Sequence, residues 1–217
     1  MSDTTITIDI FSDIVCPWCV IGGVRLEKAL AQRPELTVTR TWHPYMLNPT
    51  QPAGVRWADY AVQRFGGAAK AKEIFGHVTN VAASEGITFD YDNVATAANT
   101  RDCHRLLLLA SEYEQTWPLA TALYNAYFRD GVDLNDQQAL TSLAVGAGLP
   151  VDRVAATLAS DDYSADVDQS MATAQRLNIS GVPFFIFNQR FAVSGAQPTE
   201  IMLKALDAAS GAIDIQS

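Results

Sequence analysis

The sequence carries two cysteines separated by two residues, in the segment "SDIVCPWCVIGG". Cys16 and Cys19 flank Pro17 and Trp18. Two thiols at this spacing can form a disulfide with each other, bind a metal ion together, or pack as small residues in a core. The 217 residues contain only three cysteines, too few for a scaffold held together by disulfides. The closely spaced pair is therefore the first candidate for chemistry.

The local sequence around the pair favours redox chemistry. A helix that begins directly after Cys16 aims its first backbone N–H groups at that sulfur, and the positive end of the helix dipole stabilises a thiolate. Pro17 suits the first helical position, where its missing N–H costs nothing. Cys19 then returns to the same side of the first turn and can attack a mixed disulfide formed at Cys16. We interpret Cys16 as an exposed nucleophile and Cys19 as the resolving cysteine.

A structural metal site and an inert core position are the alternatives for this pair. A tetrahedral zinc site needs four ligands, and the sequence offers only four more Cys and His candidates: His43, His77, Cys103 and His104. None of them forms a second closely spaced pair, and two adjacent residues such as Cys103 and His104 point to different faces of a helix. We therefore expect no metal site.

The third cysteine is expected to be an inert, buried thiol. Cys103 is in phase with the apolar face of a helix, which continues through Leu106, Leu107 and Ala110. On the same helix, His104 and Arg105 are expected to point away from that face. A third redox partner is the alternative for Cys103.

Three other side chains near the pair are candidates for supporting roles. Asp9 lies on a strand, on the face opposite the isoleucines around it, where it is either a buried acceptor for the proton of Cys19 or a strand-edge carboxylate. Trp18 forms either the rim against which a substrate packs or part of the core. His43 either contacts a substrate near the pair or packs at the end of a strand.

Periodicity predicts the elements that position the pair. The segment "TITIDIFS" alternates and is rich in β-branched residues, which predicts a strand ending near Asp13. "VIGGVRLEKALAQRP" predicts a helix that stops at Pro34. "LTVTRTWHPYML" predicts a second strand that ends at Pro44. The cysteines thus lie at the strand-to-helix turn of a β-α-β unit.

The remainder of the chain predicts a helical block followed by a hairpin and a last helix. Turn residues Asn188 and Gln189 separate the two short strands of "VPFFIFNQRFAVSG", and Thr199 is expected to cap the helix of "PTEIMLKALDAAS". This order, β-α-β, helical block, β-β-α, predicts one α/β core interrupted by helices. We place the core at residues 1–50 and 177–217 and an all-helical insertion at residues 51–176.

The composition narrows the possible partners and location. A net charge of −9 and a pI near 4.7 argue against a nucleic-acid partner, because phosphate binding needs a basic patch. No stretch approaches the roughly 18 apolar residues of a membrane span, and the first residues lack the pattern of a secretory signal. We expect a cytoplasmic protein with no membrane partner.

Five segments of the sequence resemble one family in order. They are "SDIVCPWCVIGG", "HPYMLNP", "NTRDCHRLLLLA", "LYNAYFRDG" and "GVPFFIFNQRFAVSGAQP". Together they resemble the FrnE-like DsbA-family thiol–disulfide oxidoreductases of the thioredoxin superfamily, over nearly the whole chain.

This resemblance implies a thioredoxin-like fold with a helical insertion and dithiol–disulfide chemistry at Cys16 and Cys19. It also implies a cis peptide bond between Val182 and Pro183 beside the thiols, where the two residues shape a substrate groove. The expected partners are protein or small-molecule thiols and disulfides, with glutathione as a redox partner and no required cofactor. Monomer and homodimer both stay open.

The same branch includes kappa-class glutathione transferases and 2-hydroxychromene-2-carboxylate isomerases. These proteins resemble the chain in architecture but carry a serine where this chain has Cys16. The alternative function is therefore a glutathione-dependent transferase or isomerase in which Cys16 orients the glutathione sulfur. A binding module whose cysteines are idle is a third hypothesis.

Overall fold

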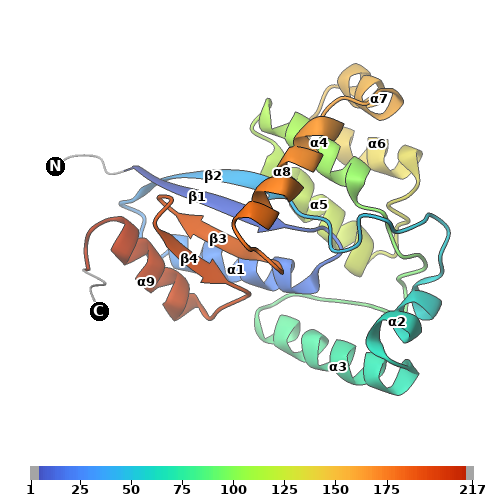
Figure 1. Cartoon of the computed structure of the whole chain (residues 1–217), viewed down its shortest axis with the longest axis horizontal. Coiled ribbons are helices and arrows are strands. Elements are labelled where there is room, and N and C mark those ends of the chain that lie inside the picture. Colours follow the sequence, from blue (N-terminus) through green and yellow to red (C-terminus); the bar gives the residue numbers. More distant parts are fainter. Residues whose placement is uncertain (1–4, 214–217) are drawn as a thin grey trace. The chain divides into compact units, whose positions relative to one another are not determined.

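A computed structural model describes residues 5–213 of the chain. Its contacts divide the chain into two units, with boundaries between residues 45 and 46 and between residues 169 and 170. Unit 1 combines the first and last parts of the chain, and unit 2 is the part between them (Figure 1). Residues 1–4 and 214–217 of the expected core lie outside the described residues. The assignment of the core to residues 1–50 and 177–217 and of the helical insertion to residues 51–176 stays a prediction.

Unit 1 contains a four-stranded mixed sheet in the order β2-β1-β3-β4. Strand β1 runs parallel to β2 and antiparallel to β3, and β3 and β4 form an antiparallel hairpin. The predicted β-α-β unit and the predicted hairpin are both confirmed. The elements are β1 (Thr5–Ser12), α1 (Pro17–Leu30), β2 (Thr37–Pro44), β3 (Phe184–Phe187), β4 (Phe191–Ser194) and α9 (Thr199–Ala209).

Helices α1 and α9 pack on one face of this sheet, and the core lies between them and the strands. Ile8 and Ile10 of β1 are buried and lie opposite Phe187 and Phe185 of β3. Helix α1 reaches this face at Gly22, where an added Cβ would lie 3.3 Å from Cζ of Phe185. The period-two burial of β1 follows from this arrangement, because alternate side chains of a strand point to opposite faces.

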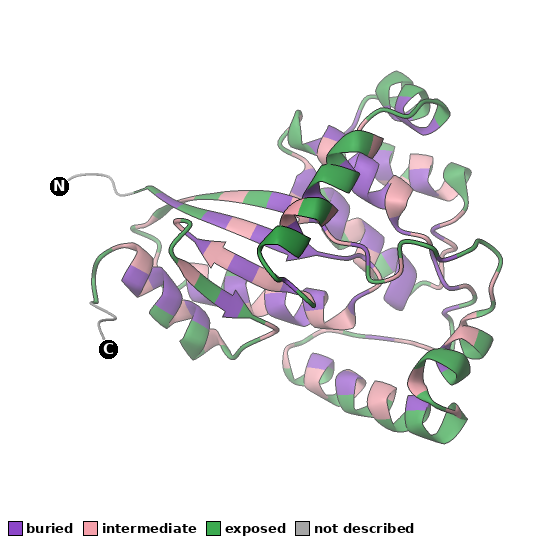
Figure 2. Cartoon of the chain, in the orientation of Figure 1, coloured by how far each residue is buried: buried purple, intermediate pink, exposed green. Residues whose placement is uncertain are grey.

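The opposite face carries a second apolar cluster around Phe11. Ala174 and Ile179 pack against Phe11, and the hydroxyl of Ser170 donates to the carbonyl oxygen of Pro44 at 2.8 Å. Helix α8 (Ser164–Arg176) therefore ends within unit 1, although the sequence interpretation assigned all of it to the insertion. Most of α8 is exposed (Figure 2).

The turn between β3 and β4 is hydrogen-bonded to β1 and to α9. Asn188 and Gln189 have positive φ angles of 49° and 56°, which Asn tolerates better than most residues. The Asn188 side chain accepts from the backbone N–H of Thr7 at 2.8 Å and donates to the carbonyl oxygen of Ala209 at 2.9 Å. The expected cap of α9 is wrong: Thr199 is already helical, and Pro198 occupies the capping position.

Unit 2 is helical, and within residues 46–169 the only β-pairing is the isolated bridge between Arg56 and Thr96. An aromatic cluster of Trp57, Phe75 and Tyr91 forms part of its interior. Among residues 5–213, no helix combines the length and the apolar character needed to cross a membrane. The helices are α2 (Trp57–Phe65), α3 (Ala68–Ser84), α4 (Arg101–Ser111), α5 (Thr116–Phe128), α6 (Gln137–Gly146), α7 (Val151–Ala159) and the first part of α8.

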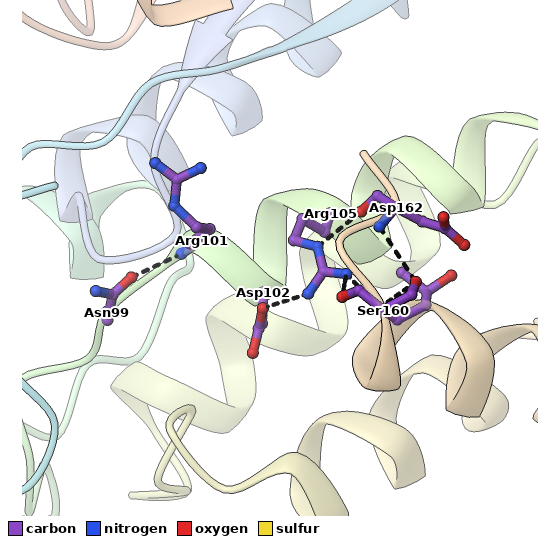
Figure 3. Close-up of polar contacts among 7 residues, drawn as sticks. Asn99, Arg101, Asp102, Arg105, Ser160 and Asp162 are labelled. Carbon is purple, nitrogen blue, oxygen red and sulfur yellow. Dashed lines mark hydrogen bonds and ion pairs between the residues drawn. The ribbon is translucent and has the colours of Figure 1, made fainter. Parts of the chain in front are cut away.

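Helix α4 is enclosed on more than one side. Cys103 is buried as predicted, but His104 and Arg105 are buried as well. The Arg105 guanidinium donates to the carbonyl oxygens of Thr157, Ser160 and Asp162 at the end of α7, and to the carboxylate of Asp102 (Figure 3). A helix that packs against α5, α6 and α7 together has no solvated face at these positions.

Candidate active site

The two cysteines lie where β1 ends and α1 begins. Cys16 occupies the N-cap of α1 with an extended backbone, and Pro17 is the first helical residue. The turn is closed by a hydrogen bond from the Cys16 N–H to the carbonyl oxygen of Asp13 at 3.1 Å. The predicted strand, turn and helix are therefore confirmed around the pair, and the N-terminus of α1 lies at Cys16.

Cys16 and Cys19 are joined through the backbone, where the N–H of Cys19 donates to the carbonyl oxygen of Cys16 at 3.0 Å. The Cys16 thiol also donates to the carbonyl oxygen of Val182, with Sγ 3.4 Å from that oxygen. Each cysteine has only 4% of its surface exposed. The expected exposure of Cys16 is wrong, because Val182 lies against its sulfur.

Burial raises the pKa of the Cys19 thiol well above its ordinary value. Cys16 raises it further, through the hydrogen bond and through the repulsion between two thiolates. Two hydrogen-bond donors act in the opposite direction and stabilise the thiolate: the hydroxyl of Ser12 and the backbone N–H of Asp13. The proton of Cys19 is therefore controlled by its immediate neighbours in the turn.

Ser12 and Asp13 are site residues that the sequence interpretation missed. Ser12 is 3% exposed and Asp13 is fully buried. Besides burial, the charge of Asp13 raises the pKa of the Tyr45 hydroxyl. The sequence interpretation treated Asp13 as an ordinary turn residue. The signal that could have found both is two adjacent polar residues at the end of an apolar strand, three and four residues before Cys16.

The segment around Pro183 borders the same turn. The Val182–Pro183 peptide bond is cis, as the family resemblance implied. Pro183 is buried, and its carbonyl oxygen accepts from the N–H of Gly195 at 2.8 Å. Arg25 of α1 donates to the carbonyl oxygen of Ala196 at 2.6 Å. These contacts hold both the 182–183 segment and the 195–196 segment close to α1.

The other three predicted site residues lie on α1 and on two strands of the sheet. Trp18 is half-buried at the second position of α1. His43 and Asp9 contact each other across neighbouring strands, with Nε2 2.8 Å from Oδ1, and the His43 ring stacks on Phe11. Asp9 is not among the groups that act on the pKa of Cys19. The substrate roles of Trp18 and His43 and the relay role of Asp9 stay predictions.

Cys103 belongs to unit 2, where it is buried in α4. Within residues 5–213, no group of three or more His, Cys, Asp and Glu side chains is placed to hold a metal ion. Cys103 thus lies in a different unit from Cys16 and Cys19.

The chain is similar to known proteins over nearly its whole length. Residues 7–207 match the family described as a DSBA-like thioredoxin domain. The structure is similar to that of a probable DsbA oxidoreductase from Streptomyces coelicolor, with 33% identity, a TM-score of 0.87, and coverage of 98% of this chain and 93% of that one. The uncharacterized protein YwbO of Bacillus subtilis is 24% identical over 208 residues, which is 93% of this chain and 96% of YwbO.

A more distant similarity links the fold to a cytosolic protein. The cytosolic disulfide reductase DsbM from Pseudomonas aeruginosa, in its structure with GSH, has a TM-score of 0.64 at 18% identity. The match covers 94% of this chain and 96% of DsbM. At this identity the comparison establishes a shared fold.

Proposed function

Because the chain belongs to the DSBA-like thioredoxin domain family, we propose that it exchanges disulfides through the motif formed by Cys16, Pro17, Trp18 and Cys19. The observation that carries the proposal is the position of Cys16 at the N-cap of α1, with Cys19 in the first turn of the same helix. A sulfur at a helix N-terminus is stabilised as the thiolate, which is the form that attacks a disulfide.

The reaction has two steps that conserve atoms and electrons. The thiolate of Cys16 attacks one sulfur of a substrate disulfide, a mixed disulfide forms, and the first substrate thiolate leaves and takes up a proton. The thiolate of Cys19 then attacks Sγ of Cys16, and the second substrate thiolate leaves. The substrate gains two electrons, and the protein ends with a Cys16–Cys19 disulfide. The reverse sequence oxidises a substrate dithiol.

The neighbouring residues take the roles that the sequence suggested. Val182 and Pro183 shape the groove beside Cys16, in keeping with the contact between the Cys16 thiol and the Val182 carbonyl oxygen. Trp18 and His43 contact the substrate, and Asp9 relays protons through its contact with His43.

The proposed partners are protein or small-molecule thiols and disulfides, including glutathione as a redox partner, with no required cofactor. The support for glutathione is the shared fold with DsbM, whose structure contains GSH. The same comparison supports a cytoplasmic location, and the sequence segments support a FrnE-like subgroup. A transferase or isomerase that uses glutathione is less well supported, because a single oriented sulfur does not require a second thiol in the same helical turn.

Three cysteine variants test the proposed function. The reduction of insulin by dithiothreitol is measured with the wild type, Cys16→Ser, Cys19→Ser and, as a matched control, Cys103→Ser. We expect Cys16→Ser to lose the activity, Cys19→Ser to accumulate mixed disulfides, and Cys103→Ser to keep the wild-type rate. A Cys16→Ser variant with the wild-type rate would refute the proposal, and one that still conjugates or isomerises glutathione substrates would favour the alternative.

A further inference from the structure

The carbonyl oxygen of Val182 lies against the reactive sulfur, so the contacts that hold Val182 in place also determine how accessible Cys16 is. Sγ of Cys16 is 3.4 Å from that oxygen, and the cysteine has only 4% of its surface exposed. Val182 precedes the sheet, because β3 begins at Phe184. Its position therefore depends on contacts from neighbouring segments and not on the pairing of the strands.

We propose that Arg25 is a positioning residue for Cys16. Its guanidinium holds the loop of residues 195–198, and through this loop it keeps the Val182 carbonyl against the Cys16 sulfur. As a role in the reaction, this inference rests on the proposed disulfide exchange, and it adds a residue that lies outside the cysteine motif.

The first link joins α1 to the loop between β4 and α9. The Arg25 guanidinium donates to the carbonyl oxygen of Ala196, with Nη1 2.6 Å from that oxygen. A hydrogen bond from a charged donor is about twice as strong as one between neutral groups. Gly22 lies one turn earlier on the same side of α1, and a Cβ added there would be 3.5 Å from Cα of Ala196. The loop is thus both packed against α1 and hydrogen-bonded to it.

The loop itself is closed by hydrogen bonds from Gln197. Its backbone N–H donates to the carbonyl oxygen of Gly195 at 2.9 Å. Its side-chain amide donates to the carbonyl oxygen of Ser194, also at 2.9 Å. Residues 194–197 therefore form one compact turn, and a restraint on Ala196 acts on Gly195 as well.

The second link joins this loop to the two residues beside the sulfur. The N–H of Gly195 donates to the carbonyl oxygen of Pro183 at 2.8 Å. Because Pro183 directly follows Val182, this bond limits how far the Val182 carbonyl can move from Cys16. A continuous series of contacts thus leads from Arg25 to the sulfur, and it lies entirely within unit 1.

Loss of the Arg25 hydrogen bond should free the loop and uncover Cys16. Iodoacetamide is a small, neutral reagent, and its reaction reports whether a thiol is accessible and reactive. The loss of the positive charge alone would have the opposite effect, because removal of a cation disfavours a nearby thiolate. Faster alkylation of Cys16 would therefore indicate displacement of the Val182 segment.

The test measures the alkylation rate of each cysteine in the reduced protein by peptide mass spectrometry. Cys103 is fully buried in unit 2, so its rate reports a general loss of structure. Arg25→Met keeps an apolar stem and removes the donor, and we expect it to raise the Cys16 rate about three- to tenfold and to leave the Cys103 rate unchanged. An unchanged Cys16 rate, or equal increases at both cysteines, would overturn the role of Arg25.

Two further variants separate the hydrogen bond from stability and from charge. Arg33→Met removes the ion pair with Asp207, in the last turn of α9 and far along that helix from the loop, so its Cys16 rate should equal that of the wild type. Arg25→Lys keeps a cationic donor and should return the Cys16 rate toward the wild-type value. An increase in Arg33→Met as large as in Arg25→Met, or no recovery in Arg25→Lys, would contradict the proposal.

Amide hydrogen exchange, followed by NMR, locates the displacement without any chemistry at the cysteines. The N–H of Gly195 should exchange about three- to tenfold faster in Arg25→Met than in the wild type. The N–H of Tyr45, which donates within the same unit to the carbonyl oxygen of Ser12 at 3.0 Å, should keep its rate. An unchanged rate at Gly195 would refute the route through the loop.

Exchange with a disulfide-linked peptide connects this inference to the proposed function. A displaced Val182 segment no longer lines the groove, so Arg25→Met should exchange about three- to tenfold more slowly than the wild type, although its Cys16 is alkylated faster. An unchanged exchange rate would overturn the part of Arg25 in the reaction. A wild type without any exchange would refute the proposed function, and the alkylation and amide measurements would still decide the role of Arg25.

A substitution in the loop keeps the proposal testable if Arg25→Met does not fold. Gln197 is exposed, so Gln197→Ala removes the side-chain bond to Ser194 without disturbing the core. It should loosen the same turn and raise the Cys16 alkylation rate relative to Cys103. Equal rates in Gln197→Ala and the wild type would then overturn the proposal.

Discussion

A Cβ atom added to Gly22 would lie 2.8 Å from Cγ of Pro183, closer than two packed carbon atoms approach. A Cβ atom added to the next residue, Gly23, would meet no neighbouring atom within 4 Å. The two adjacent glycines of α1 therefore differ in what they allow. Gly22 is required where the helix passes the proline ring, and Gly23 has no such constraint.

Gly22→Ala is expected to displace the segment of Val182 and Pro183 and to slow disulfide exchange by Cys16. The steric cost of about 1–3 kcal/mol in an overpacked position exceeds the gain of up to about 1 kcal/mol from replacing a helical glycine by alanine. The free energy of unfolding should therefore fall, as measured by urea denaturation.

Gly23→Ala is the matched control for this change. It should raise the free energy of unfolding by up to about 1 kcal/mol and leave the exchange rate unchanged. Equal effects of the two substitutions would contradict the importance of the contact between Gly22 and Pro183.

Arg105→Lys is expected to lower the free energy of unfolding by about 2–3 kcal/mol. The side chain of Arg105 is 5% exposed and serves several carbonyl oxygens at once (Figure 3). A lysine has one nitrogen and leaves some of these buried acceptors without a donor. Urea denaturation measures the effect, and Arg101→Lys is the control.

Arg101 pairs with Asp168, and the two side chains are 36% and 63% exposed. Its substitution should change the free energy of unfolding by less than about 0.5 kcal/mol. An Arg105→Lys variant as stable as Arg101→Lys would show that the buried guanidinium is dispensable.

The ion pair of Arg33 and Asp207 predicts a pH-dependent contribution to stability. Two hydrogen bonds from Arg33, at 2.7 and 2.8 Å, lower the pKa of the Asp207 carboxyl. A depressed folded-state pKa stabilises the protein above the ordinary carboxyl pKa of about 3.9, and the contribution is lost as the pH falls through the lower folded-state value. Asp207→Asn should therefore be less stable than the wild type near neutral pH, and the difference should vanish in acid.

The size of this effect is limited, because both side chains are partly exposed. Asp130→Asn is the control. Asp130 also has a lowered pKa, caused by Arg129, but these two residues are adjacent in sequence and stay close in the unfolded chain. Urea denaturation across the acid range should show a pH-dependent difference for Asp207→Asn and little for Asp130→Asn. Equal pH profiles would contradict the prediction.

The sequence by itself determined the elements and the reactive pair. The alternation in β1, the helix after Cys16 and the hairpin around Asn188 were all found where local patterns placed them. These features depend on residues close together in the chain, such as β-branched residues, a proline at a helix start and turn residues. The contact between Cys16 and Cys19 follows from the same short-range geometry.

Only the tertiary structure decided how the site is buried and which neighbours surround it. Local periodicity did not show that His104 and Arg105 are buried and predicted an exposed Cys16, because one helix face does not tell how many other segments pack around it. Asp9, a candidate relay for Cys19, was found in contact with His43 instead. Burial and partners are properties of several distant segments together, and a pattern within one segment does not contain them.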